Sequence, residues 1–329
     1  MTKTTRCFSL LAATALALTL AACGGGSSDN SPASASPSAA TQQLMQQSGA
    51  PQFTGNTATD GFNWFNFRRQ QMGLLPVARS PQIDNAAQGH SAYQAINNVI
   101  THDQDPAKQG FTGREGCPDL YPASESRMQR AGYVFTIPYT CGEVISATID
   151  TSGFAAADAL VTAIYHRFVI FEPMFRDAGT GAASVTGSYT YFTTDFGATN
   201  GFGSGLASGK VALYPYPNQQ QVPTSFDHGT EEPDPLPETQ YKGVIVGYPI
   251  SVHANITSTI GTQTFTVSQS GTVLPARQLN STIDPVNTGS STAAIIPYAP
   301  LAPATKYDVR FIGQVDGLPV DQSWSFTTR

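Results

Sequence analysis

Three residues of the types that bind metals or transfer protons lie in the middle of the chain: His102, Glu143 and His166. Imidazole and carboxylate groups are common general acids and bases, and both are also ligands of zinc. More than 20 residues separate each of the three from the next, which is too far for one local motif. Any site that they form must therefore be assembled by the fold.

An amphipathic helix is predicted just before the first of these residues. Between Ile83 and Ile100, apolar residues recur at steps of three and four, which predicts a helix that ends near Thr101. His90 lies on its apolar face, where a half-buried core histidine is the favoured interpretation and a ligand is the alternative. His102 follows the helix end, so it is expected either to point into a cleft or to contact the last carbonyl groups of the helix.

Four further elements are predicted in this part of the chain. Residues 154–171 carry the apolar stripe of a second strong helix, and His166 lies off that stripe on a more open face. Residues 184–192 alternate in the manner of a strand. Two shorter helices are expected to end just before Gly73 and Gly132, because glycine favours helix C-termini.

The composition indicates a protein that works outside the cytoplasm. The chain has 329 residues, which is enough for two domains, and it contains 23 Pro and 30 Gly but only 12% charged residues. Such a composition is typical of loop-rich and β-rich proteins of the cell exterior. The formal net charge is −6, and no cluster of Lys or Arg is present. We therefore exclude nucleic acid as a partner, since its binding depends on neutralising phosphates.

The first 22 residues have the features of a secretory signal peptide. Lys3 and Arg6 form a basic start, and an apolar run follows over residues 8–22. The run is too short for a stable membrane span, and small polar residues follow it closely. Residues 1–22 are therefore predicted to be removed from the mature protein.

The end of this segment, Leu20-Ala21-Ala22-Cys23-Gly24, resembles the lipobox of bacterial lipoproteins. The resemblance implies that Cys23 becomes the lipidated first residue, which would attach the protein to a membrane. A signal peptide with an incidental Cys is the alternative. Gly24, in place of Asp, indicates the bacterial outer membrane. Residues 23–55 are rich in small and polar residues and are predicted to form a flexible tether.

Several short motifs follow one another in a fixed order between residues 60 and 195. They are Asn66-x-x-Arg69-x-x-x-Gly73-Leu74, Ala87-x-x-His90-Ser91, His102, Gly142-Glu143, His166-Arg167 and Gly179-x-Gly181. Together they resemble the bacterial branch of the CAP superfamily (cysteine-rich secretory, antigen 5 and pathogenesis-related 1 proteins, also called SCP-like). The resemblance implies an α-β-α sandwich, so we predict an α+β fold class with residues 56–200 as a CAP/SCP-like domain.

The resemblance also implies a site. Members of the family have a central cleft lined by two His and one or two Glu, and the matching positions are His102, Glu143 and His166. Val144 stands where the family usually has Asn, and the family's second Glu would fall near Ala163, so that Glu is missing. Two neutral imidazoles and one carboxylate can hold Zn²⁺ or another divalent cation and leave a coordination position for water.

Two cysteines remain after removal of Cys7 and lipidation of Cys23. These are Cys117 and Cys141, and in an oxidising compartment such a pair is expected to form a disulfide. The disulfide would fix the segment that leads to Glu143. A Cys nucleophile is the alternative, although a bridged Cys is inert.

Residues 208–329 show no helical period and are predicted to form an all-β domain. About seven short strands are expected between clusters of turn residues, as in an antiparallel sandwich. The order of proline and aromatic residues, which ends in Trp324-Ser-Phe326, resembles bacterial Ig-like modules. An Ig-like sandwich that acts as a spacer or binding platform is therefore expected. His228 and His253 are predicted to be surface residues rather than ligands.

Two functions fit these expectations. The leading prediction is a surface-anchored lipoprotein that binds an unidentified extracellular or envelope ligand without catalysis. The alternative is a metal-dependent hydrolase, a peptidase or esterase, that uses His102, Glu143 and His166. No His-Glu-x-x-His or Gly-x-Ser-x-Gly motif is present to support a particular hydrolase class. Binding of a lipid between helices is a third alternative.

Overall fold

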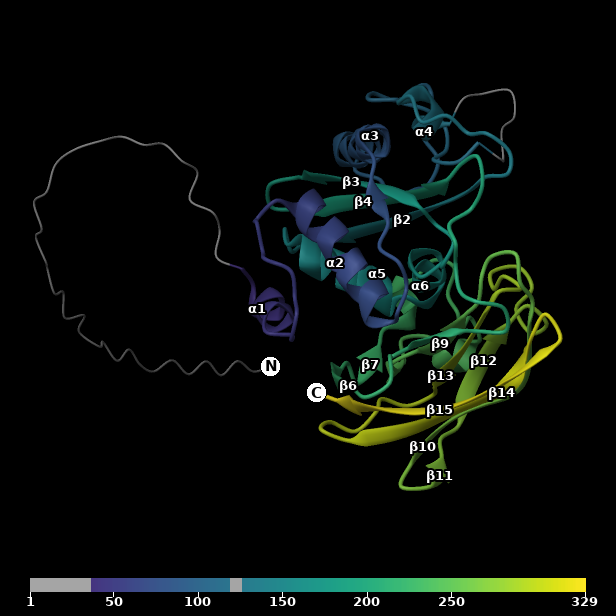
Figure 1. Cartoon of the computed structure of the whole chain (residues 1–329). Helices are drawn as coiled ribbons and strands as arrows, with labels where there is room; N and C mark the ends of the chain where they lie inside the picture. Colours follow the sequence, from purple (N-terminus) through teal and green to yellow (C-terminus); the bar gives the residue numbers. More distant parts are fainter. Residues whose placement is uncertain (1–36, 119–125) are drawn as a thin grey trace, which may run out of the picture. The chain divides into compact units, whose positions relative to one another are not determined.

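The computed structural model describes residues 37–118 and 126–329. The predicted signal peptide and Cys23 lie outside the described residues. Residues Ser36–Arg329 form one compact unit. Within this unit, helices and a four-stranded sheet come first in the chain, and the other sheets follow (Figure 1).

The first part of the chain places helices on both faces of a four-stranded sheet. Its elements are α1 Ala39–Met45, α2 Thr57–Gln71, β1 Ala78–Arg79, α3 Pro81–Asn97, α4 Arg127–Arg130, β2 Thr140–Thr148, α5 Gly153–Thr162, α6 Ile164–Ile170, β3 Asp177–Ser184 and β4 Thr190–Ala198. The strand order is β1-β3-β4-β2. Helices α3 and α4 lie on one face of the sheet, and α2, α5 and α6 lie on the other (Figure 1). The predicted α+β class is thus confirmed, and the layers are those of the expected α-β-α arrangement.

Local residues account for the ends of the two long helices. Asn56 and Ser80 precede α2 and α3, and each side chain accepts a hydrogen bond from a backbone N–H in the first turn. Gly73, at φ +77°, follows α2. Asn98 adopts the left-handed conformation at the end of α3 and so redirects the chain toward His102.

Two glycines of β3 allow α3 to pack closely on the sheet. A Cβ atom on Gly179 would lie 2.1 Å from the backbone nitrogen of Asp84, and one on Gly181 would lie 2.1 Å from that of Gln88. These distances are far below van der Waals contact, so a larger residue would displace the helix. The Gly179-x-Gly181 motif therefore sets the distance between α3 and the sheet that carries Glu143.

The single helix predicted over residues 154–171 is in fact two helices, which meet at Ala163 with a bend of 107°. The Arg167 side chain donates hydrogen bonds to two carbonyl groups at the end of α5. Its Nε donates to the oxygen of Val161 at 2.6 Å, and its Nη2 donates to that of Thr162 at 3.3 Å. Among the described residues no single helix is long and apolar enough to cross a membrane, and α5 and α6 would reach that length only as this bent pair.

Glu231 satisfies the N–H groups that the break leaves free. Its fully buried carboxylate accepts hydrogen bonds from three successive N–H groups of α6, those of residues 164, 165 and 166, at distances from 2.6 to 3.3 Å. Ala163 at the N-cap position has no side chain that could do so. The prediction of one helix was therefore wrong because a residue more than 60 positions away caps a second one.

Two other expectations differ from the structure. Residues 184–192 are not one strand, because β3 ends at Ser184, β4 begins at Thr190, and Gly187 lies in the turn at φ +73°. Their alternation covers the end of one strand and the start of the next. Part of the predicted tether is the helix α1, which forms because Leu44 packs into the hydrophobic core.

The last part of the chain consists mainly of two antiparallel sheets. The strands of this part are β5 Ala212–Tyr214, β6 Gln219–Val222, β7 Ser225–Phe226, β8 Val246–Gly247, β9 Ile250–His253, β10 Ile260–Gln269, β11 Thr272–Val273, β12 Ala276–Asn280, β13 Thr292–Pro297, β14 Lys306–Val315 and β15 Leu318–Thr328. Of these, β7 and β8 pair with each other in a separate two-stranded sheet. One sheet has the order β11-β10-β14-β15-β6, in which β15 and β6 are parallel, and the other has the order β12-β13-β9-β5. Side chains from both sheets share one hydrophobic cluster with the helices.

His228 and His253 are buried, contrary to the expectation that they lie at the surface. Each makes hydrogen bonds inside the protein, although Nδ1 of His253 has no partner among the described residues. His228 pairs with Asp234 at 2.6 Å and with a backbone carbonyl, and His253 pairs with Ser251 at 2.9 Å. Burial lowers the pKa of His253 to about 3, so it is uncharged at neutral pH.

Arg167 joins the helical part of the chain to the β-sheets. Its side chain is fully buried, and its Nη1 donates to the carbonyl oxygen of Pro249 at 2.7 Å. The guanidinium lies 4.8 Å from the ring centre of Tyr214 and 4.9 Å from that of Tyr248. Such stacking favours a buried cation. The Arg167 side chain therefore contributes both to the break after α5 and to the junction between the helices and the β-sheets.

We expect Glu231→Ala to lower the free energy of unfolding by about 2–4 kcal/mol, because three N–H groups of α6 lose a charged acceptor. The neighbouring exposed Glu232 provides the control, and Glu232→Ala should change stability by about 0.5 kcal/mol or less. Glu231→Gln, which retains an acceptor oxygen, should fall between the two. Chemical denaturation measures all three. Equal stability of the two alanine variants would contradict the capping role.

Candidate functional site

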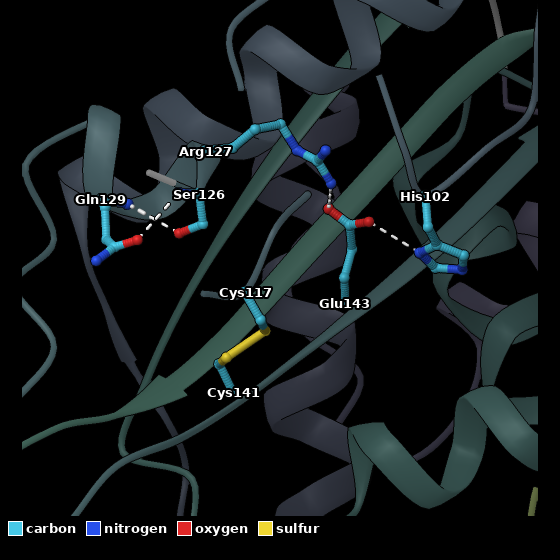
Figure 2. The surroundings of a disulfide bond; sticks show 7 residues. All are labelled: His102, Cys117, Ser126, Arg127, Gln129, Cys141 and Glu143. Atoms are coloured by element: carbon cyan, nitrogen blue, oxygen red, sulfur yellow. Dashed lines mark hydrogen bonds and ion pairs between the residues drawn. A yellow bond between two sulfur atoms is a disulfide. The ribbon is translucent and has the colours of Figure 1, made fainter. Parts of the chain in front are cut away.

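Glu143 is the centre of a polar cluster on the face of the sheet that carries α3 and α4. Its side chain, on β2, is only 7% exposed. Oε1 accepts a hydrogen bond from Nδ1 of His102 at 2.8 Å, and Oε2 accepts one from Nη2 of Arg127 at 2.5 Å (Figure 2). One carboxylate thus connects an exposed imidazole with a buried guanidinium.

Arg127 is the first residue of α4. This helix lies where a short helix was predicted to end just before Gly132. Ser126 and Gln129 form a capping box that fixes the start of this helix. The Arg127 side chain is fully buried, and Nη1 donates to the carbonyl oxygen of Arg114 at 2.9 Å. A buried guanidinium requires a compensating charge, which Glu143 supplies.

Opposing effects act on the ionisation of Glu143. Burial raises the pKa of its carboxyl group, but the nearby Arg127 guanidinium, with His90 and His102, outweighs burial and brings the pKa well below its usual range. Glu143 is therefore ionised at neutral pH. Its negative charge is held in the protein by a cation rather than by water.

Asp195 lies directly opposite Glu143, on β4. It is fully buried, and neither of its oxygens has a hydrogen-bond partner among the described residues. A Cβ atom on Gly116 would lie 2.8 Å from Glu143 Oε2 and 3.0 Å from Asp195 Oδ1, so the backbone covers this pair closely. Burial, and then the charge of Glu143, raise the pKa of Asp195 well above its usual range. The pair thus carries one negative charge, and it lies on Glu143.

His90 supports the site from α3. Its Nε2 lies 2.7 Å from the carbonyl oxygen of Thr101, and its Nδ1 lies 2.9 Å from Nε2 of Gln104. A ring that donates from Nε2 and accepts at Nδ1 satisfies both contacts in its neutral form. Burial lowers the pKa of His90 to about 4, which agrees with that form. The favoured interpretation of His90 as a core histidine fits this environment, and its contacts fix the segment that carries His102.

His102 is the exposed member of the cluster, since 57% of its side chain is accessible. Glu143 binds its Nδ1, so Nε2 points away from the carboxylate on the open side of the ring (Figure 2). A carboxylate on Nδ1 fixes both the orientation and the tautomer of an imidazole. In its neutral form, His102 therefore presents the lone pair of Nε2 to the surroundings.

His166 does not join His102 and Glu143. It lies at the start of α6, where its Nδ1 is 3.1 Å from Oε1 of Glu231. The structure thus brings together two of the three predicted cleft residues and places the third elsewhere. The cause is the same break at Ala163, which turns the first residues of α6 toward Glu231.

The residues around Glu143 do not fit a divalent metal. Among the described residues, no group of three or more His, Cys, Asp or Glu is placed so that it could hold a metal ion. Both oxygens of Glu143 are already hydrogen bonded, and one of them faces the Arg127 cation. A second cation at this carboxylate would meet electrostatic repulsion. The zinc ligation expected for His102, Glu143 and His166 therefore has no geometric basis here.

The predicted disulfide between Cys117 and Cys141 is confirmed (Figure 2). It joins the segment after Gly116 to β2, two residues before Glu143. Since both thiols are used in the bond, neither is available as a nucleophile. The disulfide therefore helps to hold the covering backbone over the buried carboxyl pair.

Sequence reasoning missed Arg127 and Asp195, although Asp195 carried a usable signal. It is the only charged residue between Ser184 and Gly209, a segment otherwise made of small, aromatic and hydroxyl residues. A lone charge in such a strand indicates either a functional group or a buried acid. Arg127 gave no such signal, because basic residues are ordinary in a short surface helix.

The match with known proteins covers the part of the chain that carries the site. Residues 62–196 match the model of the CAP family, described as the cysteine-rich secretory protein family. A comparison with curated protein sequences finds no match.

Two solved structures are similar to less than half of the chain. One is an extracellular protein containing an SCP domain from Bacillus anthracis str. Ames, with 26% identity and a TM-score of 0.33, over 43% of this chain and 39% of that one. The other is an outer surface protein from Borrelia burgdorferi, with 15% identity and a TM-score of 0.33, over 42% of this chain and 90% of that one. This chain thus spans 39% of the length of the Bacillus protein.

Glu143 and Asp195 lie side by side, yet removal of the two carboxyl groups should lower the free energy of unfolding by different amounts. Glu143→Gln removes the charge that compensates Arg127 and should lower the free energy of unfolding by about 3–5 kcal/mol at neutral pH. Asp195→Asn replaces an uncharged acid by an amide of the same shape and should cost about 1 kcal/mol or less. Urea denaturation of the two variants and the parent protein gives both values. Equal losses would show that the charge is not confined to Glu143.

Proposed function

Because residues 62–196 match the CAP family model, we propose that the chain is an extracytoplasmic bacterial protein that binds a ligand, without catalysis, at His102. The observation that carries this proposal is the fixed His102 ring, which is exposed to solvent while its partner Glu143 is buried on Arg127. Orienting an exposed side chain through a buried ion pair is a feature of recognition sites. A surface histidine without such a role needs no buried partner.

The geometry favours a ligand that offers a hydrogen-bond donor. With Nδ1 bound to Glu143, the neutral His102 ring accepts at Nε2. Hydroxyl and amide groups, as found in glycans and peptides of a cell envelope, are donors of this kind. The proposed ligand is therefore polar and uncharged where it contacts His102.

Hydrolysis is the second candidate, and one observation favours it. A histidine whose Nδ1 contacts a carboxylate has the arrangement of a general base. In this role, His102 would take a proton from water through Nε2. A bound metal has no part in this version of the hydrolase, because the described residues do not fit one.

We further propose that Cys23 carries the lipid anchor and that the C-terminal sheets act as an Ig-like spacer or binding platform. The lipobox resemblance of residues 20–24 supports the anchor. The two sheets that share one hydrophobic cluster support a sandwich. The outer membrane remains the expected location.

Mass spectrometry of the mature N-terminus tests the anchor. An acylated Cys23 as the first residue is expected, and Cys23→Ser should move the protein from the membrane fraction to the soluble fraction. A mature chain that begins elsewhere, without lipid, would contradict the anchor. This experiment does not test the proposed ligand site at His102.

Glycan and peptide arrays test the site. A ligand of the parent protein should lose at least about tenfold in affinity with His102→Ala, because about 1.4 kcal/mol of hydrogen bonding is removed. Asp103→Ala, at the exposed neighbouring position, is the control and should bind normally. Array ligands that bind both variants equally would contradict the proposed site. Turnover of peptide or ester libraries that His102→Ala abolishes would establish the hydrolase instead.

Zinc calorimetry completes the comparison. We expect no stoichiometric uptake that depends on His102, since Arg127 already occupies one oxygen of Glu143. Zinc uptake that His102→Ala abolishes would contradict the conclusion that the residues around Glu143 do not fit a divalent metal.

A further inference from the structure

A hollow lies on the opposite face of β2 from Glu143. It has a volume of about 250 Å³ and is lined by α6, by Gly142 and by loops of the last part of the chain. Strand alternation directs residues 142 and 143 to opposite faces, and a Cβ atom on Gly142 would meet Val169 of α6 at 2.7 Å. The sheet therefore separates this hollow from the His102 site.

The walls of the hollow are mainly apolar and aromatic. Tyr165, Phe168 and Phe175 contribute rings, and Ile256 closes one side. The hydroxyl group of Tyr165 donates to Asp284 at 2.8 Å, so its proton is already used. Such a lining favours a ligand with a hydrocarbon or aromatic body.

Glu172 is the only acidic or basic side chain apart from the Tyr165 phenol among the described residues that line the hollow. It follows α6 and is 5% exposed. Its Oε1 accepts hydrogen bonds from the N–H groups of Met174 at 2.9 Å and Ile256 at 3.0 Å. Its Oε2 accepts no hydrogen bond from the described residues. It is also not one of their fully buried polar atoms that lack a hydrogen-bond partner. One carboxylate oxygen is thus available to a bound molecule.

We propose that this hollow binds a small organic amine in its ammonium form, with Glu172 Oε2 as the acceptor and the aromatic walls around its apolar body. An ammonium group supplies both the charge and the N–H donor that the free oxygen lacks. The rings of Phe168 and Phe175 favour a cation beside them. The volume is below that of drug-sized sites and suits one ring with a short chain.

A ligand of opposite charge does not fit. A carboxylate or phosphate would face Glu172, and the lining offers no basic side chain to bind it. A hydrocarbon of the same shape would cover the carboxylate without providing a donor, which costs desolvation energy, and an alcohol would provide a donor but no compensating charge. The hollow therefore discriminates by charge as well as by size.

The ionisation of Glu172 makes this binding depend on pH. Burial raises the pKa of Glu172 to about 7, although the N–H groups of Met174 and Ile256, and the charge of Arg69 on α2, act in the other direction. Other ionisable groups near the hollow are Tyr165, its partner Asp284 and the uncharged His253, whose ring centre lies 5.8 Å from that of Phe168. Because the ammonium requires the ionised carboxylate, its affinity should rise as pH increases through about 7.

Calorimetry with 2-phenylethylamine tests the proposal on the mature chain. We expect saturable binding that tightens about tenfold between about pH 6 and about pH 8, as the ionised fraction of Glu172 rises, while the amine stays protonated. The neutral isostere 2-phenylethanol should bind at least about tenfold more weakly at the higher pH. These comparisons use the unaltered protein and do not depend on the folding of a variant.

Glu172→Gln provides the matched variant. The amide oxygen can still accept from Met174 and Ile256, so the fold should be retained, but the charge is removed. Amine affinity should fall at least about tenfold and lose its pH dependence. His102→Ala should leave amine binding unchanged, since it lies in the other site.

Four results would overturn the proposal. They are the absence of saturable amine binding, equal affinity for the alcohol, an affinity that is flat across this pH range, and unchanged binding by a folded Glu172→Gln protein. None of them bears on the ligand proposed for His102, because the hollow and that site use different faces of β2.

Discussion

The buried ion pair between Glu143 and Arg127 is the interaction on which the site depends. Transfer of two charges from water costs several kcal/mol for each, and only short hydrogen bonds and mutual attraction offset that cost. The pair connects β2 with α4, while His90 of α3 holds the segment that carries His102 beside it. The exposed orientation of His102 is thus a consequence of contacts that are almost entirely inside the protein.

The C-terminal sheets change what the part of the chain that matches the CAP family model presents. Glu231 caps α6 and binds His166, and Arg167 of the same helix is buried against Pro249 and two tyrosine rings. His166, which the family resemblance assigns to a cleft, is therefore used with its neighbour Arg167 to join two parts of one compact unit. The site that remains has one open imidazole. It is suited to hydrogen bonding and poorly suited to holding a cation.

Local sequence signals predicted much of this arrangement. The stop at Gly73 after α2 and the apolar period before His102 depend on residues close in sequence, and the Gly179-x-Gly181 motif belongs to the ordered set that resembles the CAP family. The break at Ala163 was unpredictable from a window of neighbours, because its two causes are the buried Arg167 side chain and a cap from Glu231. Asp195 became meaningful only through the strand register that sets it opposite Glu143.

Three buried carboxyl groups show how the surroundings decide the chemistry of one functional group. Burial alone would favour the neutral acid in all three. The Arg127 guanidinium reverses that preference for Glu143, while Asp195, whose nearest charge is negative, stays protonated. Glu172 has two N–H donors and a more weakly acting cation in Arg69, so its pKa lies near neutrality. Two faces of one strand thereby carry sites of different character, a fixed imidazole on one and a titrating carboxylate on the other.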